Sequence, residues 1–102
     1  MSKAQKINVV GLGEHVNAPW TGEYKMVYNT MNSNTDHWIH KQTKNYFIYR
    51  NSYYWFISNS DFKFRTENII GKKEYTYGHA PVGTYENANE EDVATIDWID
   101  FP

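Results

Sequence analysis

The side chains best suited to bind a metal ion are the four histidines, and their positions argue against a shared site. His37 and His40 are three residues apart in a predicted strand, so their side chains point to opposite faces and cannot hold one ion together. His15 and His79 lie singly in glycine-containing loops. The chain has no cysteine, which excludes a thiolate metal site, a disulfide and a cysteine nucleophile. We therefore predict no metal and no cofactor.

The carboxylates and glycines that could support other chemistry lack the partners they would need. Glu90–Asp92 are consecutive acids without the interleaved glycine and oxygen ligands of a calcium loop. Asp97 and Asp100 are an odd number of residues apart on one predicted strand, so they face opposite ways and cannot form a catalytic carboxylate pair. Gly11–Gly13 does not extend into a dinucleotide-binding fingerprint. The sequence shows no serine–histidine–aspartate arrangement either, and it predicts a protein that is not an enzyme.

The length of 102 residues predicts a single domain over 1–102, in which residues 1–6 form an N-terminal arm. Aromatic residues make up 18% of the chain and charged residues 22%, which is typical of a folded, soluble domain. The first residues contain no apolar signal core, and no apolar run reaches the ~18 residues of a membrane helix. We expect no membrane partner, and a location in the cytoplasm or in an assembly such as a virion.

The net charge of -2 conceals an uneven distribution along the chain. All ten basic residues lie between Lys3 and Lys73, whereas seven of the twelve acids follow Lys73. The acidic stretch also carries Val93, Ile96 and Trp98, so we expect it to fold back onto the rest and the asymmetry to cancel largely in three dimensions. Because the basic residues are mostly single and the net charge is negative, nucleic acid is not an expected partner.

Short stretches of alternating apolar and polar residues, bounded by turn residues, recur along the chain and predict strands. We find no helical apolar stripe of useful length, and residues 89–93 form one helical turn at most. Gly71–Lys73 is expected to be a turn and 78–83 a loop. The pattern is typical of an all-β fold, a small antiparallel barrel or sandwich of seven to eight short strands. The predicted strands are residues 7–10, 22–28, 37–40, 46–49, 53–57, 62–65, 74–77 and 94–101.

A hairpin of two aromatic strands is the most informative feature. With its turn centred on Asn51–Ser52, Tyr49 pairs with Tyr54. One face of the hairpin then carries Tyr46, Ile48, Trp55 and Ile57, and the other carries Phe47, Tyr49, Tyr54 and Phe56. We predict that the first face lies in the core, with Tyr24 and Trp98 close by. The second face is either covered by another layer of the domain or presented to a partner.

Several segments follow one another in an order that is shared with a known type of module. They are Val9–Gly13, Gly22–Tyr24, Tyr46–Tyr49, Trp55–Ile57, Tyr75–Tyr77 and a closing strand with Trp98. This order resembles a recurrent, largely uncharacterised β-module of the form V-x-G-x-G…G-x-Y…Y-x-I-Y…W-x-I. Such modules occur in repeat-containing surface proteins and in structural proteins of phages and other viruses. The resemblance spans about residues 7–101 and implies a small β fold without a catalytic residue.

Two classes of function fit these observations. The first is a non-catalytic structural or protein-interaction module, a subunit of a larger assembly such as a virion, which binds a protein partner or associates with itself. Its partner-binding residues would be Phe47, Tyr49, Tyr54 and Phe56. The alternative is a lectin-like carbohydrate-binding module that stacks sugar rings on exposed Trp20, Tyr49 and Tyr54. A concave surface with a polar rim at these residues would favour a glycan, and a flat apolar patch would favour assembly.

Overall fold

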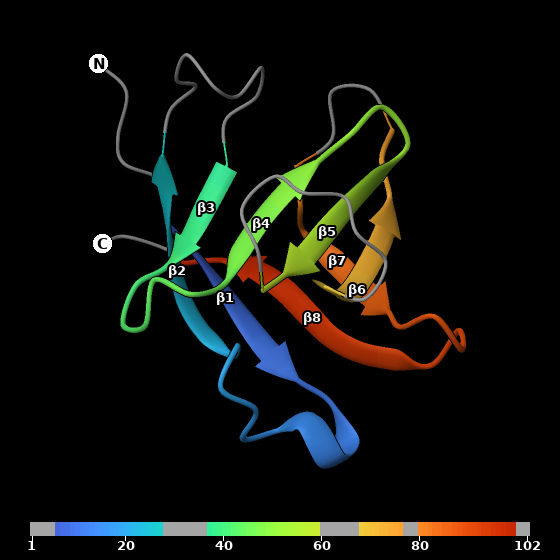
Figure 1. Cartoon of the computed structure of the whole chain (residues 1–102), viewed down its shortest axis with the longest axis horizontal. Helices are drawn as coiled ribbons and strands as arrows, with labels where there is room; N and C mark the ends of the chain where they lie inside the picture. The colour runs from blue at the N-terminus through green and yellow to red at the C-terminus, as the bar shows by residue number, and fades with distance from the viewer. Residues whose placement is uncertain (1–5, 28–36, 60–67, 77–79, 100–102) are drawn as a thin grey trace.

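Each strand of the chain pairs with the next one in sequence, and the last pairs with the first, so that the sheet closes on itself (Figure 1). The computed structural model describes residues 6–27, 37–59, 68–76 and 80–99. The strands are β1 Lys6–Gly11, β2 Gly22–Val27, β3 His37–His40, β4 Phe47–Arg50, β5 Tyr54–Ser58, β6 Ile69–Glu74, β7 Gly83–Glu86 and β8 Asp92–Trp98, with a short 3₁₀ helix η1 at Gly13–His15. The predicted all-β fold is therefore confirmed, and it is an eight-stranded antiparallel barrel.

The barrel is filled by inward-pointing side chains from successive strands. Ile48, Trp55 and Ile57 are buried as predicted, and so is Tyr24. Trp98 lies close to the core, as predicted, but at its edge, where the side chain is 41% exposed. Trp98 is the last residue of β8, and one of its ring contacts is to Trp38, with 6.4 Å between the ring centroids. The interior cluster consists of Ile7, Val9, Trp20, Tyr24, Trp38, Ile48, Trp55, Ile57, Tyr85, Val93, Ala94 and Ile96.

Several predicted boundaries differ from the observed ones. Gly71–Lys73 is not a turn but the middle of β6, because a glycine there lets the strand approach β7 and β8 closely. A β-carbon at Gly71 would lie 3.1 Å from a methyl group of Val93 and 3.3 Å from the β-carbon of Tyr85. Strand β7 was not predicted, and the predicted strand 62–65 lies outside the described residues. Residues 89–93 form a turn and the start of β8 instead of a helical turn, and Lys6 belongs to β1.

Two tyrosines fix the start of β2 and the start of β7 in the same way. The Tyr24 hydroxyl donates to the carbonyl oxygen of Trp20 at 2.6 Å, four residues earlier, and the Tyr85 hydroxyl donates to that of Pro81 at 2.7 Å. In both cases a glycine with positive φ stands two residues before the tyrosine: Gly22 has a φ of +112° and Gly83 a φ of +135°. Burial raises the pKa of both phenols well above its usual range, so both remain protonated donors.

Replacing Tyr85 by phenylalanine is expected to lower the free energy of unfolding by about 1–3 kcal/mol, because the buried carbonyl of Pro81 loses its donor. The measurement is chemical denaturation followed by tryptophan fluorescence. Tyr53→Phe is the control, since Tyr53 is 72% exposed, and it should leave the denaturation midpoint unchanged. Equal midpoints for both variants would show that the buried hydrogen bond contributes nothing to stability.

Candidate functional site

The hairpin of β4 and β5 has a longer connection than the sequence predicts. Tyr49 pairs with Phe56 rather than with Tyr54, so the partner strand is shifted by two residues. The Asn51 side chain causes this, because its Oδ1 accepts from the backbone N–H groups of both Tyr53 and Tyr54 at 2.8 Å and so builds a wider turn. A shift by two residues keeps every side chain on its predicted face. The two faces are therefore as expected, although the pairing is not.

The predicted partner-binding face lies on the outside of the barrel and is partly buried within the chain. Tyr49 is 1% exposed and Phe56 7%, and neither belongs to the interior cluster. Their ring centroids are 5.9 Å apart, and Tyr54 continues the row at 6.0 Å from Phe56. Phe47 and Tyr54 are half-buried. Tyr49 thus offers almost no surface to a partner, whereas Tyr54 retains an accessible ring.

The three residues expected to bind a glycan do not come together. Trp20 is 7% exposed and packs into the barrel interior, which corrects the expectation of an exposed platform. A tight turn is the cause: both the backbone N–H and the hydroxyl of Thr21 donate to the carbonyl oxygen of Ala18, at 3.1 and 2.7 Å. The chain therefore turns back at this point and Trp20 enters the core. Of the three candidates, only Tyr54 remains accessible.

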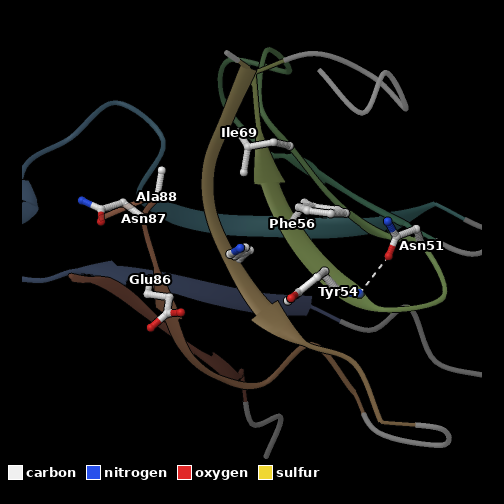
Figure 2. A pocket seen from close by; sticks show the side chains of 8 residues that line it. Asn51, Tyr54, Phe56, Ile69, Glu86, Asn87 and Ala88 are labelled. Carbon is white, nitrogen blue, oxygen red and sulfur yellow. Dashed lines mark hydrogen bonds between the residues drawn. The ribbon is translucent and has the colours of Figure 1, made fainter. Parts of the chain in front are cut away.

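Tyr54 and Phe56 form one wall of a groove on the outside of the barrel, over β5, β6 and the end of β7 (Figure 2). The groove has an apolar half of about 290 Å³ and a polar half of about 520 Å³, which share Tyr54, Lys72 and Glu86. The apolar half is completed by Asn51, Phe56, Ile69, Asn87 and Ala88. The polar half is completed by Lys73, Glu74, Thr84 and Glu90. We call this feature the β5–β7 groove.

The groove follows the weakest junction of the barrel. Strands β6 and β7 are joined by a single residue pair, Lys72 with Glu86, whereas β5 and β6 are paired from Tyr54 with Glu74 to Ser58 with Ile69. In Figure 2, Ile69, Phe56 and Tyr54 stand on one side of the groove and Glu86, Asn87 and Ala88 on the other. The groove thus opens beside the single pair that joins β6 and β7.

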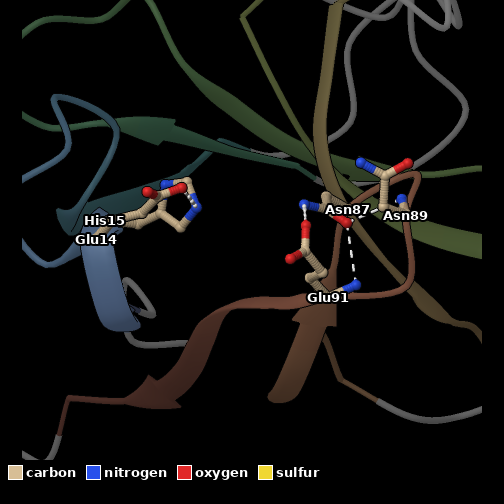
Figure 3. A network of polar contacts seen from close by, with 5 residues as sticks. All are labelled: Glu14, His15, Asn87, Asn89 and Glu91. Atoms are coloured by element: carbon tan, nitrogen blue, oxygen red, sulfur yellow. Dashed lines mark hydrogen bonds and ion pairs between the residues drawn. The ribbon is translucent and has the colours of Figure 1, made fainter.

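Asparagine-centred turns hold both rims of the groove. Asn51 fixes the β4–β5 turn, as described above. Asn87 fixes the β7–β8 turn: its Oδ1 accepts from the backbone N–H groups of Asn89 and Glu91 at 2.9 and 3.0 Å, and its Nδ2 donates to the Glu91 carboxylate at 3.2 Å (Figure 3). Side-chain bonds of this kind give a turn one defined shape. The groove is therefore already formed in the free protein.

The electrostatics of the groove follow from which charges are paired elsewhere. Within the described residues, ion pairs involve the acids Glu14 and Glu23, both early in the chain. Lys41 and Lys6 lie 3.2 and 3.5 Å from Glu23, and the hydrogen bond and charge of Lys41, together with the charge of Lys6, lower the pKa of this carboxyl. In the described part of the chain, no ion pair joins an acid that follows Lys73 to a base, so no such pair neutralises the described carboxylates of this stretch.

The histidines on β3 are placed as their spacing predicts, on opposite faces of the strand. His40 points inward beside Tyr24, and both of its ring nitrogens are occupied. Its Nδ1 accepts from the backbone N–H of Thr43 at 3.1 Å, so Nε2 carries the proton and donates to the carbonyl oxygen of Thr21 at 2.7 Å.

Among the described ranges, no three metal-ligating side chains gather into a site that could hold an ion. No helix in these ranges is long and apolar enough to span a membrane.

Several groove residues were not found from the sequence, chiefly Ile69, Lys72 and Glu86. A signal for β7 was present, since Gly83-Thr84-Tyr85 repeats the spacing of Gly22-Glu23-Tyr24.

Comparison of the chain with protein-family models, with curated proteins and with solved structures finds no match, so the fold and the groove carry the functional argument.

Proposed function

We propose that this barrel is a non-catalytic protein-interaction module that binds a polypeptide segment of another protein in the β5–β7 groove. The observation that carries the proposal is a concave surface with an aromatic wall of Tyr54 and Phe56, fixed at both rims by Asn51 and Asn87. Binding to a preformed groove avoids the entropy cost of ordering it, and tyrosine is among the residues that contribute most to interfaces.

The chemical groups in the groove support binding rather than catalysis. Among the described lining residues, no hydroxyl or amine is hydrogen-bonded to a side chain that could serve as its general base. The Lys72 ammonium lies 4.7 Å from the centre of the Tyr54 ring, where it makes a cation–π contact. The groove therefore offers a ligand a concave shape, charged groups and an aromatic surface.

A place in a larger particle fits this proposal. In such an assembly, which includes a virion, a segment of a neighbouring subunit would occupy the groove, and a second copy of this chain could supply that segment. A cytoplasmic protein with a transient partner would use the same surface. Sedimentation of the purified protein at micromolar concentration separates these cases, because self-association raises the mass with concentration and a heterologous partner leaves a monomer.

The direct test uses peptides. Random twelve-residue peptides displayed on phage are selected on the immobilised barrel, and the selected peptides are then measured against variants. Tyr54→Ala is expected to weaken their binding by at least tenfold, about 1.4 kcal/mol, because it removes an accessible aromatic wall. The loss of the Lys72 contact accounts for about 0.5–1 kcal/mol of lowered stability, and the lost packing against Phe56 adds to it.

The neighbouring Tyr53 gives a matched control, because it is 72% exposed and does not line the groove. Tyr53→Ala should bind the selected peptides as the parent does, within about twofold, which is a difference of roughly 0.4 kcal/mol. Two results would refute the proposal: failure to enrich any peptide, or selected peptides that bind Tyr54→Ala as tightly as the parent.

A glycan is the second candidate ligand, and the position of Tyr54 favours it. The ring stands in a concave surface rimmed by amide and charged groups, as stacking on a sugar would require. The test is titration with chitotriose, mannotriose and sialyllactose, followed by ¹H–¹⁵N spectra. Amide shifts that are confined to the groove and disappear in Tyr54→Ala would support sugar binding. Unchanged spectra at millimolar sugar would rule out a glycan and leave a peptide as the one proposed ligand.

A further inference from the structure

The two halves of the β5–β7 groove differ in chemistry, and this difference identifies the kind of segment that fits. On the basis of the proposed function, we infer that the bound segment carries a bulky apolar side chain and, within two positions of it, a basic one. The apolar side chain occupies the half lined by Phe56 and Ile69, and the basic one lies beside the carboxylates of the polar half.

The apolar half is matched to one large side chain. Its wall and floor are the Tyr54 ring, the Phe56 ring and Ile69, with Ala88 opposite. A volume of about 290 Å³ is at the lower end of the range for ligand pockets, so it suits a leucine or an aromatic ring better than a whole helix face. Burial of such a side chain supplies the non-directional part of the binding free energy.

The polar half carries an excess of negative charge. Three carboxylates line it, from Glu74, Glu86 and Glu90, against the ammonium groups of Lys72 and Lys73. None of the three carboxylates forms an ion pair with a basic residue of the described ranges. Because these side chains already stand in a concavity, a cation placed there gains attraction from more than one of them.

Both lysines of the polar half already have contacts of their own. The Lys72 ammonium stands over the Tyr54 ring at 4.7 Å. The carbon chain of Lys73 lies against Gly83, where a side chain other than hydrogen would collide with it, and its Nζ is 3.5 Å from the backbone oxygen of Glu74. The cations are thus held against the wall of the groove, and the carboxylates remain for a ligand.

The experiment uses three synthetic peptides that differ at one position each: acetyl-Gly-Ser-Phe-Gly-Arg-Ser-Gly-amide, the form with Glu in place of Arg, and the form with Ala in place of Phe. Each is titrated into ¹⁵N-labelled protein. The Phe–Arg peptide should shift amides of Tyr54, Phe56, Ile69 and Lys72, and should bind about threefold or more tightly than the Phe–Glu peptide. The Ala–Arg peptide should cause no saturable shift, and added salt should reduce the preference for Arg.

A charge variant identifies the carboxylates responsible. Glu86→Gln combined with Glu90→Gln should bind the Phe–Arg peptide no more tightly than the Phe–Glu peptide, whereas Asp97→Asn, at an exposed acid of β8 outside the groove, should keep the preference. If the parent already binds both peptides equally, or the Phe–Arg peptide shifts residues outside the groove, the inference is wrong. Phage-selected peptides that still depend on Tyr54 would then show that the proposed function stands, and their absence would remove both.

Discussion

Replacing Trp55 by alanine is expected to lower the free energy of unfolding by about 3–5 kcal/mol, the cost typical of a deleted core tryptophan. The side chain is 5% exposed and belongs to the interior cluster. Its ring lies 5.8 Å from the ring of Trp38 and 6.0 Å from that of Tyr75, and the guanidinium of Arg50 lies 5.9 Å from it. Domains of this size have a total stability of about 5–15 kcal/mol, so the variant should lose a large share of it and its thermal midpoint should fall by more than about 10 °C. Urea denaturation and calorimetry provide the measurement.

Trp55→Phe is the matched control for this prediction. The indole Nε1 of Trp55 is buried without a hydrogen-bond acceptor in the described structure, so phenylalanine gives up no hydrogen bond and removes an unsatisfied donor. The phenylalanine variant should therefore lose less than half of what the alanine variant loses. An alanine variant that melts within a few degrees of the parent would show that Trp55 does not support the core.

A single added methyl group at Gly11 is expected to have a comparable effect. The β-carbon of alanine at this position would overlap the carbonyl oxygen of His15 and lie 3.0 Å from a methyl group of Thr21. The obstacle is backbone, held by the hydrogen bond from the His15 N–H to the carbonyl of Leu12 at 2.9 Å, so it cannot rotate away. We expect Gly11→Ala to lower the free energy of unfolding by about 3 kcal/mol or more, at the upper end of the cost of overpacking.

The same loop supplies a control for Gly11. Gly13 has a φ of +57°, and a β-carbon there would meet no atom within 4 Å. Gly13→Ala should therefore cost only the conformational penalty of a left-handed residue, about 1–2 kcal/mol. Denaturation midpoints of the two variants, measured in the same buffer, should differ clearly. If Gly11→Ala were as stable as Gly13→Ala, the result would contradict a close approach of the backbone at η1 to the end of β1.

Much of the fold could be predicted from the sequence because strands leave a pattern of period two. The alternation in Gly22–Tyr28 and the aromatic runs on either side of Asn51 identified β2, β4 and β5, and the side chains that share a face. Errors fell where tertiary contacts override local preference. The glycine at position 71 indicated a turn, whereas it serves the close packing of β6 on β7 and β8.

Little of the candidate site could be predicted in the same way. The sequence identified Tyr54 and Phe56 as members of an aromatic face outside the core, and both line the groove. It also offered Tyr49 and Trp20 as candidate binding residues, and both are buried. Exposure depends on what the rest of the chain places over a side chain, and a pattern of alternation contains no information about that.

Three features follow from the sequence alone, because each depends on neighbours in the chain or on composition: the all-β class, the core face of the central hairpin and the excess of acids after Lys73. Three further features depend on how the whole chain folds: the sheet closes through β1 and β8, β6 and β7 meet at the single pair Lys72 with Glu86, and a groove opens there. Closure is a property of the whole sheet, because twist and register accumulate over all strands. The position of its weakly paired junction therefore cannot be predicted from the residues of any single strand.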